Sequence, residues 1–380
     1  MEANRNKTKK VSRKTRQKRK LVLFIVELFF LALVLLGLYL WGMFSKIDYN
    51  PTFDDTQAGI NEDINSQTVE KMSGYTNIAL FGLDNRRAGN YEYGNSDTIM
   101  IASINNDTHE VKLVSVYRDT YLNIGEGKYT KVNAAFNLGG VERAVKMLNV
   151  NLDLNITEYV CVDWAALIEA IDALGGIELQ ITDQEVFYIN GYLNEIDEVL
   201  GLKTPRVTHS GFVTLNGAQA TAYARIRYTA GSDFLRTSRQ RIILETMLNK
   251  AKTCSFTELS NMCNAVMDDI STSLSISEIL GLAKDITKYS IAETTGFPFY
   301  VTGRYLADGG DAMIPIDLSK NVTELHGFLF ENENYTPSNT VELIDETIIE
   351  RSGVTEDTPP YDVDKYNDTT GANGTHFKDE

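Results

Sequence analysis

Cysteine and histidine are scarce in this chain, and their positions do not form a metal-binding pattern. The 380 residues include three cysteines and four histidines, and these do not follow the ligand spacing of a zinc site. Cys161 lies in an apolar stretch, so it is expected to be a buried and unreactive thiol. Cys254 and Cys263 could form one disulfide in an oxidising compartment, and the sequence leaves that question open. No arrangement typical of a nucleophilic triad is found either.

Positive charge is also scarce beyond the first twenty residues. The formal charge of the chain is −16; residues 1–20 hold ten Lys or Arg and one acid, a net +9, and Glu27 adds −1, so the chain from Ser45 onward carries −24. A domain this acidic is a poor general ligand for DNA or RNA, because nucleic-acid binding depends on cationic contacts with phosphates. The sequence therefore predicts that nucleic acid is not a partner.

One long apolar run follows the basic arm directly. Residues 21–44 are almost wholly apolar, with Glu27 as the exception, and at about 1.5 Å per residue they can span a bilayer core of about 30 Å. The run is longer than the apolar part of a secretory signal, and residues 43–47 offer no small-residue cleavage site. Because positive charge stays on the cytoplasmic side, we expect an uncleaved, single-pass anchor in the cell membrane with its N-terminus in the cytoplasm. The arm would contact anionic membrane lipid, and the acidic bulk would be extracellular.

The rest of the chain alternates apolar runs of strand length with stretches of helical periodicity. Strands are predicted at 77–82, 97–104, 111–116, 159–162 and 177–181, and helices at 133–148, 165–174, 216–224, 236–250, 256–267 and 276–289. This alternation predicts an α/β fold of three layers, α-β-α, with a central mixed β-sheet, preceded by one transmembrane helix. The predicted parts are the arm (1–20), the anchor (21–44), a stalk or linker (45–74), one folded domain (75–350) and a disordered tail (351–380).

Two aspartates occur where predicted strands end or begin. Asp84 follows the first strand, close to Arg86, and Asp97 opens the second strand. Ligands of open α/β sheets bind at such strand ends. Two carboxylates at neighbouring strand ends could share a hard cation such as Mg²⁺, with Mn²⁺ as an alternative, because these ions prefer oxygen ligands. Taken singly, each aspartate could equally be an ordinary turn or capping residue.

Charged residues also surround the next predicted helix. Arg118 and Asp119 follow the third predicted strand, and Lys131 and Asn133 precede the helix, whose free N–H groups favour anions. The competing interpretation is a surface pair between Arg118 and Asp119 and an ordinary helix cap at Asn133.

Five arginines lie close together in a region that contains a single acid, Asp233. They are Arg225, Arg227, Arg236, Arg239 and Arg241. Such a cluster is costly without an anion, and arginine forks match the oxygens of phosphate groups. A phosphate-rich ligand is therefore expected at this cluster.

The spacing within the cluster selects the residues that face this ligand. As an extended strand, residues 225–227 would place both arginines on one face. As a helix, residues 236–240 would place Arg236, Arg239 and Gln240 on one face. Arg241 is off that face and is expected to be structural.

The order of these motifs resembles the LytR–CpsA–Psr family of envelope phosphotransferases. In chain order they are G-x-D-x-R at 82–86, S-D-T at 96–98, S-x-x-R-D-T at 115–120, K-x-N-A-A-F-x-x-G-G at 131–140, D-A-L-G-G-I at 172–177, L-N-G-x-Q-A at 215–220, Y-A-R-I-R at 223–227 and D-F-x-R-T-x-R-Q at 233–240. Each motif alone is weak, but eight in one order are highly specific. The resemblance covers about residues 76–290.

The resemblance implies an enzyme that moves a glycan polymer, such as teichoic acid or capsule, from a polyprenyl-pyrophosphate carrier to peptidoglycan. It implies that Asp84 and Asp97 hold Mg²⁺ and that an apolar tunnel takes the lipid. The residues implied to bind pyrophosphate are Arg86, Arg118, Lys131, Arg225, Arg227, Arg236, Arg239 and Gln240. Arg118 is also expected to be catalytic, and the base that accepts the proton of the acceptor hydroxyl is left open among Asp84, Asp97 and Asp119.

Two departures from the family pattern and two alternative functions accompany this expectation. Asn95 stands where the family often has arginine, and Tyr117 stands where it often has proline. One alternative is a membrane-bound regulator of transcription, although an arm of about twenty residues leaves no room for a helix-turn-helix domain. The other is a polyprenyl-pyrophosphate hydrolase or binding protein, for which the same residues would serve.

Overall fold

The structure is a computed structural model of the whole chain, and it describes residues 42, 46–50, 53, 55–84, 91, 94–227 and 232–361. The predicted basic arm, all of the predicted anchor except Gly42, and Arg86 lie outside these residues. Within the described ranges, the helices are too short or too polar to cross a bilayer. The anchor therefore stays a prediction from the sequence.

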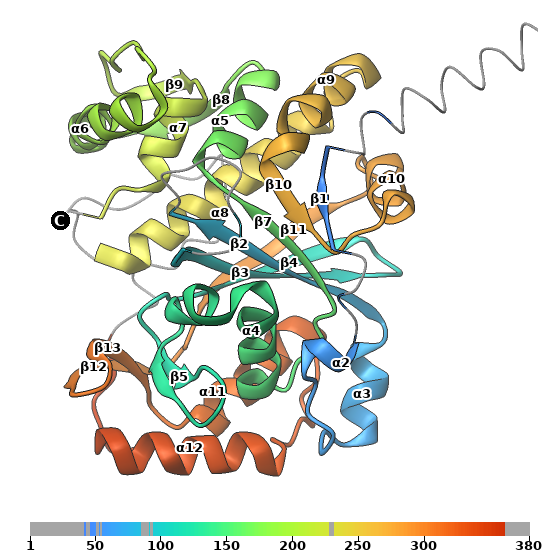
Figure 1. Cartoon of the computed structure of the whole chain (residues 1–380), viewed down its shortest axis with the longest axis vertical. Coiled ribbons are helices and arrows are strands. Elements are labelled where there is room, and N and C mark those ends of the chain that lie inside the picture. The colour runs from blue at the N-terminus through green and yellow to red at the C-terminus, as the bar shows by residue number, and fades with distance from the viewer. Residues whose placement is uncertain are drawn as a thin grey trace, which may run out of the picture. The chain divides into compact units, whose positions relative to one another are not determined.

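A seven-stranded sheet forms the centre of the domain (Figure 1). In spatial order its strands are β1 (Asp48–Tyr49), β10 (Ile270–Thr272), β7 (Glu158–Val162), β2 (Tyr75–Leu83), β3 (Ser96–Asn105), β4 (Glu110–Val116) and β11 (Ser290–Phe297). The β2–β7 and β4–β11 pairs are parallel, whereas β2–β3 and β3–β4 are antiparallel. The prediction of a mixed central sheet in an α/β fold is confirmed.

One face of the sheet is covered by helices from both halves of the chain (Figure 1). They are α2 (Asp55–Ala58), α3 (Ser66–Met72), α4 (Ala134–Leu152), α11 (Leu318–Phe330) and α12 (Asn339–Ser352). A large apolar core fills this layer, and Phe81, Phe136 and Phe330 are fully buried in it.

The opposite face carries the helices that will concern the functional site (Figure 1). They are α5 (Trp164–Ala173), α6 (Asp183–Leu200), α7 (Gly217–Ala224), α8 (Ser232–Ala251) and α9 (Phe256–Val266). Between α5 and α7 the chain forms two antiparallel strands, β8 (Ile177–Ile181) and β9 (Gly211–Leu215). In the sequence, α6 lies between these two strands. The three layers agree with the prediction.

Smaller elements complete the domain. They are β5 (Tyr121–Asn123), β6 (Tyr129–Lys131), the 3₁₀ turn η1 (Met267–Asp269), α10 (Ile276–Lys284), β12 (Val301–Leu306) and β13 (Gly310–Pro315). β5 pairs with β6, and β12 pairs with β13, both antiparallel.

The predicted boundaries at 74/75 and 350/351 are wrong. β1 is the edge strand of the main sheet, and Phe53, Ala58 and Met72 are buried in the core, so the described part of 45–74 belongs to the folded domain. A few apolar residues in a polar stretch are sufficient to attach it. At the other end α12 continues to Ser352, and the backbone N–H of Tyr361 donates to the carbonyl of Val301 at 2.8 Å.

The extended segment predicted at 225–227 is also wrong. Arg225 is the C-cap of α7, with φ −96° and ψ −7°, and the chain then leaves the helix without forming a strand. Ile226 is nevertheless fully buried. The alternation of polar and apolar side chains is therefore produced by a helix end and not by a strand.

Candidate functional site

The functional site begins where three strands of the main sheet meet at one edge. Gly82 of β2 pairs with Thr98 of β3 on one side and with Val162 of β7 on the other. A Cβ at position 82 would lie 2.8 Å from the Cβ of Thr98, so only glycine permits this approach. Asp84 follows β2 and Asp97 is the second residue of β3, so both predicted carboxylates lie at this edge.

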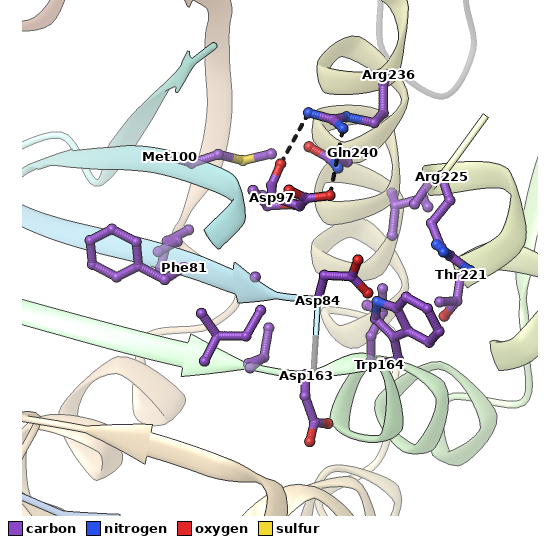
Figure 2. Close-up of a pocket in the computed structure, with 18 of the residues that line it drawn as sticks. Phe81, Asp84, Asp97, Met100, Asp163, Trp164, Thr221, Arg225, Arg236 and Gln240 are labelled. Atoms are coloured by element: carbon purple, nitrogen blue, oxygen red, sulfur yellow. Dashed lines mark hydrogen bonds and ion pairs between the residues drawn. The ribbon is translucent and has the colours of Figure 1, made fainter. Parts of the chain in front are cut away.

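A cavity of about 450 Å³ lies between this edge and the helices α5, α7 and α8. Its apolar walls come from the strands and from the inner faces of α5 and α8: Leu80, Phe81, Met100, Val160, Val162, Leu167, Ile243 and Leu244. Its polar residues include Asp84, Asp97, Thr221, Arg225, Arg227, Arg236 and Gln240. Figure 2 shows Asp84 and Asp97 at the strand ends, with Arg236 and Gln240 projecting from α8. The cavity therefore joins a charged part to an apolar part.

Asp97 and Asp233 hold three of the predicted arginines together. Arg118 Nη1 donates to Asp97 Oδ1 at 2.6 Å, and Arg236 Nη2 donates to the Asp97 carbonyl at 3.1 Å. Arg236 Nη2 is also 2.8 Å from Asp233 Oδ1, which lies 3.8 Å from Arg118 Nε and 3.9 Å from Arg227 Nη2. Asp233, the single acid in this region of the sequence, is thus the common neighbour of three arginines.

Burial and charge act against each other in this cluster. Burial raises the pKa of Asp233, and the arginines Arg236 and Arg118 oppose that rise. Burial also lowers the pKa of Arg236, while Asp233 opposes the fall. For Arg118 burial alone would lower the pKa, but the surrounding carboxylates, with Asp97 first, raise it overall.

Asp119 and Lys131 extend the cluster away from the cavity. Lys131 Nζ is 3.1 Å from Asp119 Oδ1, and Asp119 Oδ2 is 3.6 Å from Arg118 Nε. The structure therefore brings Arg118, Asp119 and Lys131 together as predicted, although none of the three lines the cavity itself.

Arg225 has a different set of neighbours from the other arginines. Its guanidinium lies 3.7 Å from the ring centroid of Trp164 and 5.3 Å from that of Tyr192. Its Nη2 donates to Glu195 Oε2 at 3.0 Å. Figure 2 shows Arg225 beside Trp164 and Thr221, on the side of the cavity away from Arg236. The stacking and the ion pair hold the guanidinium at the cavity wall.

Arg239 does not join the cavity, contrary to the prediction. Its side chain is 2% exposed, and its Nε donates to Glu185 Oε1 at 2.9 Å. On α8 the side chains of Arg236 and Gln240 are one turn apart and line the cavity, whereas Arg239 is turned towards α6. Arg241 is also buried, 2% exposed, and lies outside the cavity lining, as expected.

The positive charge of the site is matched by carboxylates from other parts of the chain. The eleven charged residues are Arg118, Lys131, Arg225, Arg227, Arg236, Asp84, Asp97, Asp119, Asp163, Asp233 and Glu195. Five are cationic and six are acidic, so the formal charge is −1. The expectation of an uncompensated arginine cluster is therefore wrong, because five of the six acids lie far away in the sequence.

The hydrogen-bonding capacity of the site, unlike its charge, is not satisfied. Seven buried polar atoms of cavity or cluster residues find no hydrogen-bond partner among the described residues: Arg118 Nε, Arg225 Nη1, Arg236 Nε, Thr221 Oγ1, Gln240 Oε1 and both carboxylate oxygens of Asp233. Thr221 is 1% exposed and lines the cavity from α7. Unpaired buried donors are costly. Their grouping around one cavity indicates a polar ligand.

The carboxylates at the strand ends fit one kind of metal ion. In the part of the chain that the structure describes, no three His, Cys, Asp or Glu side chains form a cluster able to hold a metal by themselves. Asp84 and Asp97 supply two carboxylates on one cavity. Mg²⁺ is commonly held by one or two carboxylates together with waters and substrate phosphates. The two carboxylates suit this mode of binding, in which water and substrate supply the other ligands. They do not suit a metal centre whose ligands all come from the protein.

The departure from the family pattern at Tyr117 leaves Arg118 in the cluster. Tyr117 is fully buried, its N–H donates to Phe297 at 3.0 Å, and its ring meets that of Phe234 edge to face with centroids 4.7 Å apart. This contact packs the turn that carries Arg118 against α8. The side chain of Asn95, in contrast, is exposed.

The three cysteines are free thiols in the structure. Cys161 is buried, and burial raises its pKa, as expected of an unreactive thiol. Cys254 Sγ donates to the carbonyl of Lys250 at 3.4 Å, so the possible disulfide with Cys263 is not formed.

Several residues of the site were not predicted from the sequence. They are Trp164, Tyr192, Glu195 and Thr221 around Arg225, and Asp233 as the neighbour of three arginines. Tyr192 and Glu195 belong to α6, which the sequence analysis missed. Its start was visible as a capping box, in which Thr182 and Glu185 bond each other's backbone N–H groups.

Comparison with known proteins gives consistent results. A model described as the LytR_cpsA_psr family matches residues 45–317. A relative in Enterococcus faecalis, named polyisoprenyl-teichoic acid–peptidoglycan teichoic acid transferase TagU, is 31% identical over 264 residues, 69% of this chain and 80% of that protein. A Streptococcus mutans protein named biofilm regulatory protein A is 29% identical over 273 residues, 68% of this chain and 64% of that protein.

A solved structure shows the same fold. The crystal structure of a Streptococcus agalactiae protein matches with a TM-score of 0.59 at 24% identity, covering 73% of this chain and 93% of that one. The family named from the motifs and the expectation of an enzyme of the phosphotransferase type are confirmed. The chain belongs to the LytR_cpsA_psr family.

Proposed function

We propose that this chain is a membrane-anchored extracellular enzyme that transfers a glycan polymer from a polyprenyl-pyrophosphate carrier to peptidoglycan, with the assistance of Mg²⁺. One observation carries the proposal. A single cavity joins a charged group of arginines and carboxylates to walls of apolar strand and helix residues. A lipid pyrophosphate likewise joins a charged group, the pyrophosphate, to an apolar chain. The name of the Enterococcus faecalis relative supports the glycan and the acceptor.

The arginines would act by binding and orienting the pyrophosphate. Arg227, Arg236 and Gln240 line the cavity, and Arg118 lies directly behind Asp97. Phosphoryl transfer depends mainly on positioning and on neutralising charge. The acceptor hydroxyl would attack the phosphorus that carries the glycan, a new phosphodiester bond would form, and polyprenyl phosphate would leave.

Charge balance supports the metal. The site residues sum to a formal charge of −1, and a pyrophosphate esterified at both ends carries one negative charge on each phosphate. Burying that ligand in a site without net positive charge would leave the two negative charges of the ligand uncompensated. Mg²⁺ held by Asp84 and Asp97 would cancel them. When bound, the ion would stabilise the charge that develops on the phosphate oxygens.

The anchor would place this cavity where lipid-linked substrates are found. The support is the apolar run at 21–44 behind a basic arm. The domain begins only a few residues later, at β1.

Transfer can be tested with the full chain in lipid nanodiscs. The reaction would contain a polyprenyl-pyrophosphate glycan, peptidoglycan and Mg²⁺, and both acceptor-linked glycan and released polyprenyl phosphate would be measured. We expect both products in equal amounts, and loss of both after chelation of the metal or with Arg227→Ala. Arg206→Ala is a matched control, because Arg206 is similarly exposed, 41% against 37% for Arg227, and pairs with Asp197 away from the cavity.

The two products separate the alternatives. Lipid phosphate released without acceptor-linked glycan would indicate a hydrolase, and binding without release of either would indicate a carrier protein. Full activity of Arg227→Ala would contradict the proposed role of the arginines.

A further inference from the structure

A buried ion pair lies behind the cavity wall, between α6 and α8. Glu185 is 3% exposed and Arg239 is 2% exposed. Their side chains meet with Glu185 Oε1 2.9 Å from Arg239 Nε. Neither residue lines the cavity.

The same guanidinium reaches the chain segment that carries the cavity arginines. Arg239 Nη1 donates to the carbonyl oxygen of Ile226 at 3.3 Å. Ile226 is fully buried and stands between Arg225 and Arg227, both of which line the cavity. α7 has ended at Ala224, and beyond it the backbone N–H of Ile226 still donates to the Tyr223 carbonyl at 3.2 Å, while residues 226–227 belong to no helix or strand. The bond from Arg239 supplies one of the contacts that hold this segment.

The carboxylate of Glu185 is itself fixed by the start of α6. Its Oε2 accepts from the backbone N–H of Thr182 at 2.9 Å and from the hydroxyl of Thr182 at 3.2 Å. One oxygen is therefore tied to the helix start and the other to Arg239. This chain of contacts runs from α6 through α8 to Ile226.

We infer that Glu185 and Arg239 form a positioning pair, which holds the Ile226 carbonyl and so aims Arg225 and Arg227 at the phosphate groups of the ligand. The inference rests on the proposed function for the identity of that ligand. It gives α8 two roles: Arg236 and Gln240 face the cavity, and Arg239 on the other side orients the neighbouring arginines.

A merely structural pair would have a different signature. It would lower the stability of the domain, and its effect on ligand binding would be independent of Arg227. A positioning pair acts through Arg225 and Arg227, so its effect on binding must shrink once one of them is removed.

The first measurement needs no ligand. The chain has two tryptophans, Trp41 and Trp164, and the Arg225 guanidinium lies 3.7 Å from the Trp164 ring. In a Trp41→Phe background, fluorescence therefore reports the position of Arg225. Arg239→Lys keeps a charge beside Glu185 but cannot also reach Ile226 with a second donor. We expect it to change the Trp164 emission.

Two further variants complete this set. Glu185→Gln retains an oxygen for Thr182 but removes the charge that orients Arg239, and it should change the emission in the same direction. Lys250→Met is the matched control on α8, because Lys250 Nζ donates to the Gly176 carbonyl, away from residues 225–227. It should leave the emission unchanged.

The second measurement is a double-mutant cycle with farnesyl pyrophosphate and Mg²⁺ as the probe, using the full chain. We expect Arg239→Lys to raise the Kd about tenfold in the natural background and to have little effect in an Arg227→Ala background. Lys250→Met should change the Kd equally little in both backgrounds.

The outcomes distinguish this inference from the proposed function. An unchanged Trp164 emission in folded Arg239→Lys and Glu185→Gln, or equal effects of Arg239→Lys in both backgrounds, would overturn the positioning role. A changed emission in a protein that does not bind the probe would uphold the positioning role and overturn the proposed ligand.

Discussion

Asp233 and Asp153 are both buried carboxylates, but their neighbours differ in kind. Asp153 is fully buried at the end of α4 and accepts hydrogen bonds from neutral donors: Asn61 at 2.6 Å, the Tyr335 hydroxyl at 2.6 Å, and the amide and hydroxyl of Ser338 at 2.8 and 2.7 Å. Asp233 is 4% exposed and lies among arginines, where neither carboxylate oxygen makes a hydrogen bond of good geometry within the described residues.

The difference separates a network that holds the fold from one that awaits a ligand. The Asp153 network is saturated and joins three distant parts of the chain, so it is complete without any other molecule. Around Asp233 carboxylates offset the charges of the arginines, but one donor each of Arg118 and Arg236 makes no hydrogen bond within the described residues. Such incomplete networks reduce stability, and proteins retain them where function requires it.

Replacing Asp233 should have the largest effect, and on catalysis. Asp233→Asn keeps the shape but removes the charge that holds Arg118, Arg227 and Arg236 together. We expect kcat/KM for transfer to fall about a thousandfold, as when arginine positioning is lost in phosphoryl transfer. The free energy of unfolding should fall as well, because buried Arg236 would lose the carboxylate that offsets its own burial, so transfer is measured per folded molecule. A large loss of stability with normal transfer per folded molecule would reverse the assignment.

The corresponding change at Asp153 should affect stability and not catalysis. Asp153→Asn keeps a residue that tolerates the left-handed backbone at φ 50°, but it turns amide hydrogens towards donors that need an acceptor. We expect the free energy of unfolding to fall by about 3 kcal/mol. Urea unfolding would measure it, and transfer per folded molecule should stay within about twofold of the unchanged chain. A thousandfold loss of transfer here would break the contrast with Asp233.

The stability of the region around Asp153 should also depend on pH, through His326. His326 is fully buried, donates from Nε2 to the Leu152 carbonyl at 3.0 Å, and stacks on Tyr335 with centroids 3.8 Å apart. Burial lowers its pKa from 6.5 to about 4. The unfolded chain therefore takes up a proton first as the pH falls, so the stability is complete above pH 6.5 and is lost towards pH 4.

The size of this effect can be isolated by substitution. Between pH 7.5 and pH 5 the His326 contribution should fall by about 2 kcal/mol. His326→Gln retains a donor for Leu152 but does not titrate, so the pH dependence of its unfolding free energy should be weaker by that amount. Equal pH dependence in both proteins would show that His326 has the same pKa in the folded and the unfolded chain.

The strand ends of the site were predictable because their signals are local. Asp84, Asp97 and Arg118 each adjoin a short apolar run, and the structure places all three at one edge of the sheet. Arg236 and Gln240 were predictable for a similar reason, since a spacing of four on a helix fixes a common face.

The partners of these residues were not predictable in the same way. Arg239 is turned from the cavity because of Glu185, which lies 54 residues earlier in a helix that the sequence analysis missed. Arg225 faces the cavity from a helix end and not from a strand. Carboxylates brought together by the fold also cancelled a charge cluster that looked isolated in the sequence. Local sequence patterns could not predict these features of the site, because they depend on side chains that are distant in the sequence.

Replacing Glu195 should have the smallest effect. Whether ligand binding becomes tighter or weaker shows whether the ion pair of Glu195 with Arg225 belongs to a complete structural network or to a site that awaits a ligand. Glu195 is 39% exposed and holds Arg225 Nη2 at 3.0 Å, while Nη1 of the same arginine has no hydrogen-bond partner among the described residues. If this pair belonged to a saturated structural network, its loss would weaken the site. In a site that awaits an anion, Glu195 competes with the ligand for Arg225, and stacking on Trp164 keeps the guanidinium in place without it. Glu195→Gln should therefore tighten binding of farnesyl pyrophosphate about threefold at low salt, which is the size of a partly exposed ion pair, and the gain should shrink as salt screens it. Weaker binding would place Glu195 among the supports of the site.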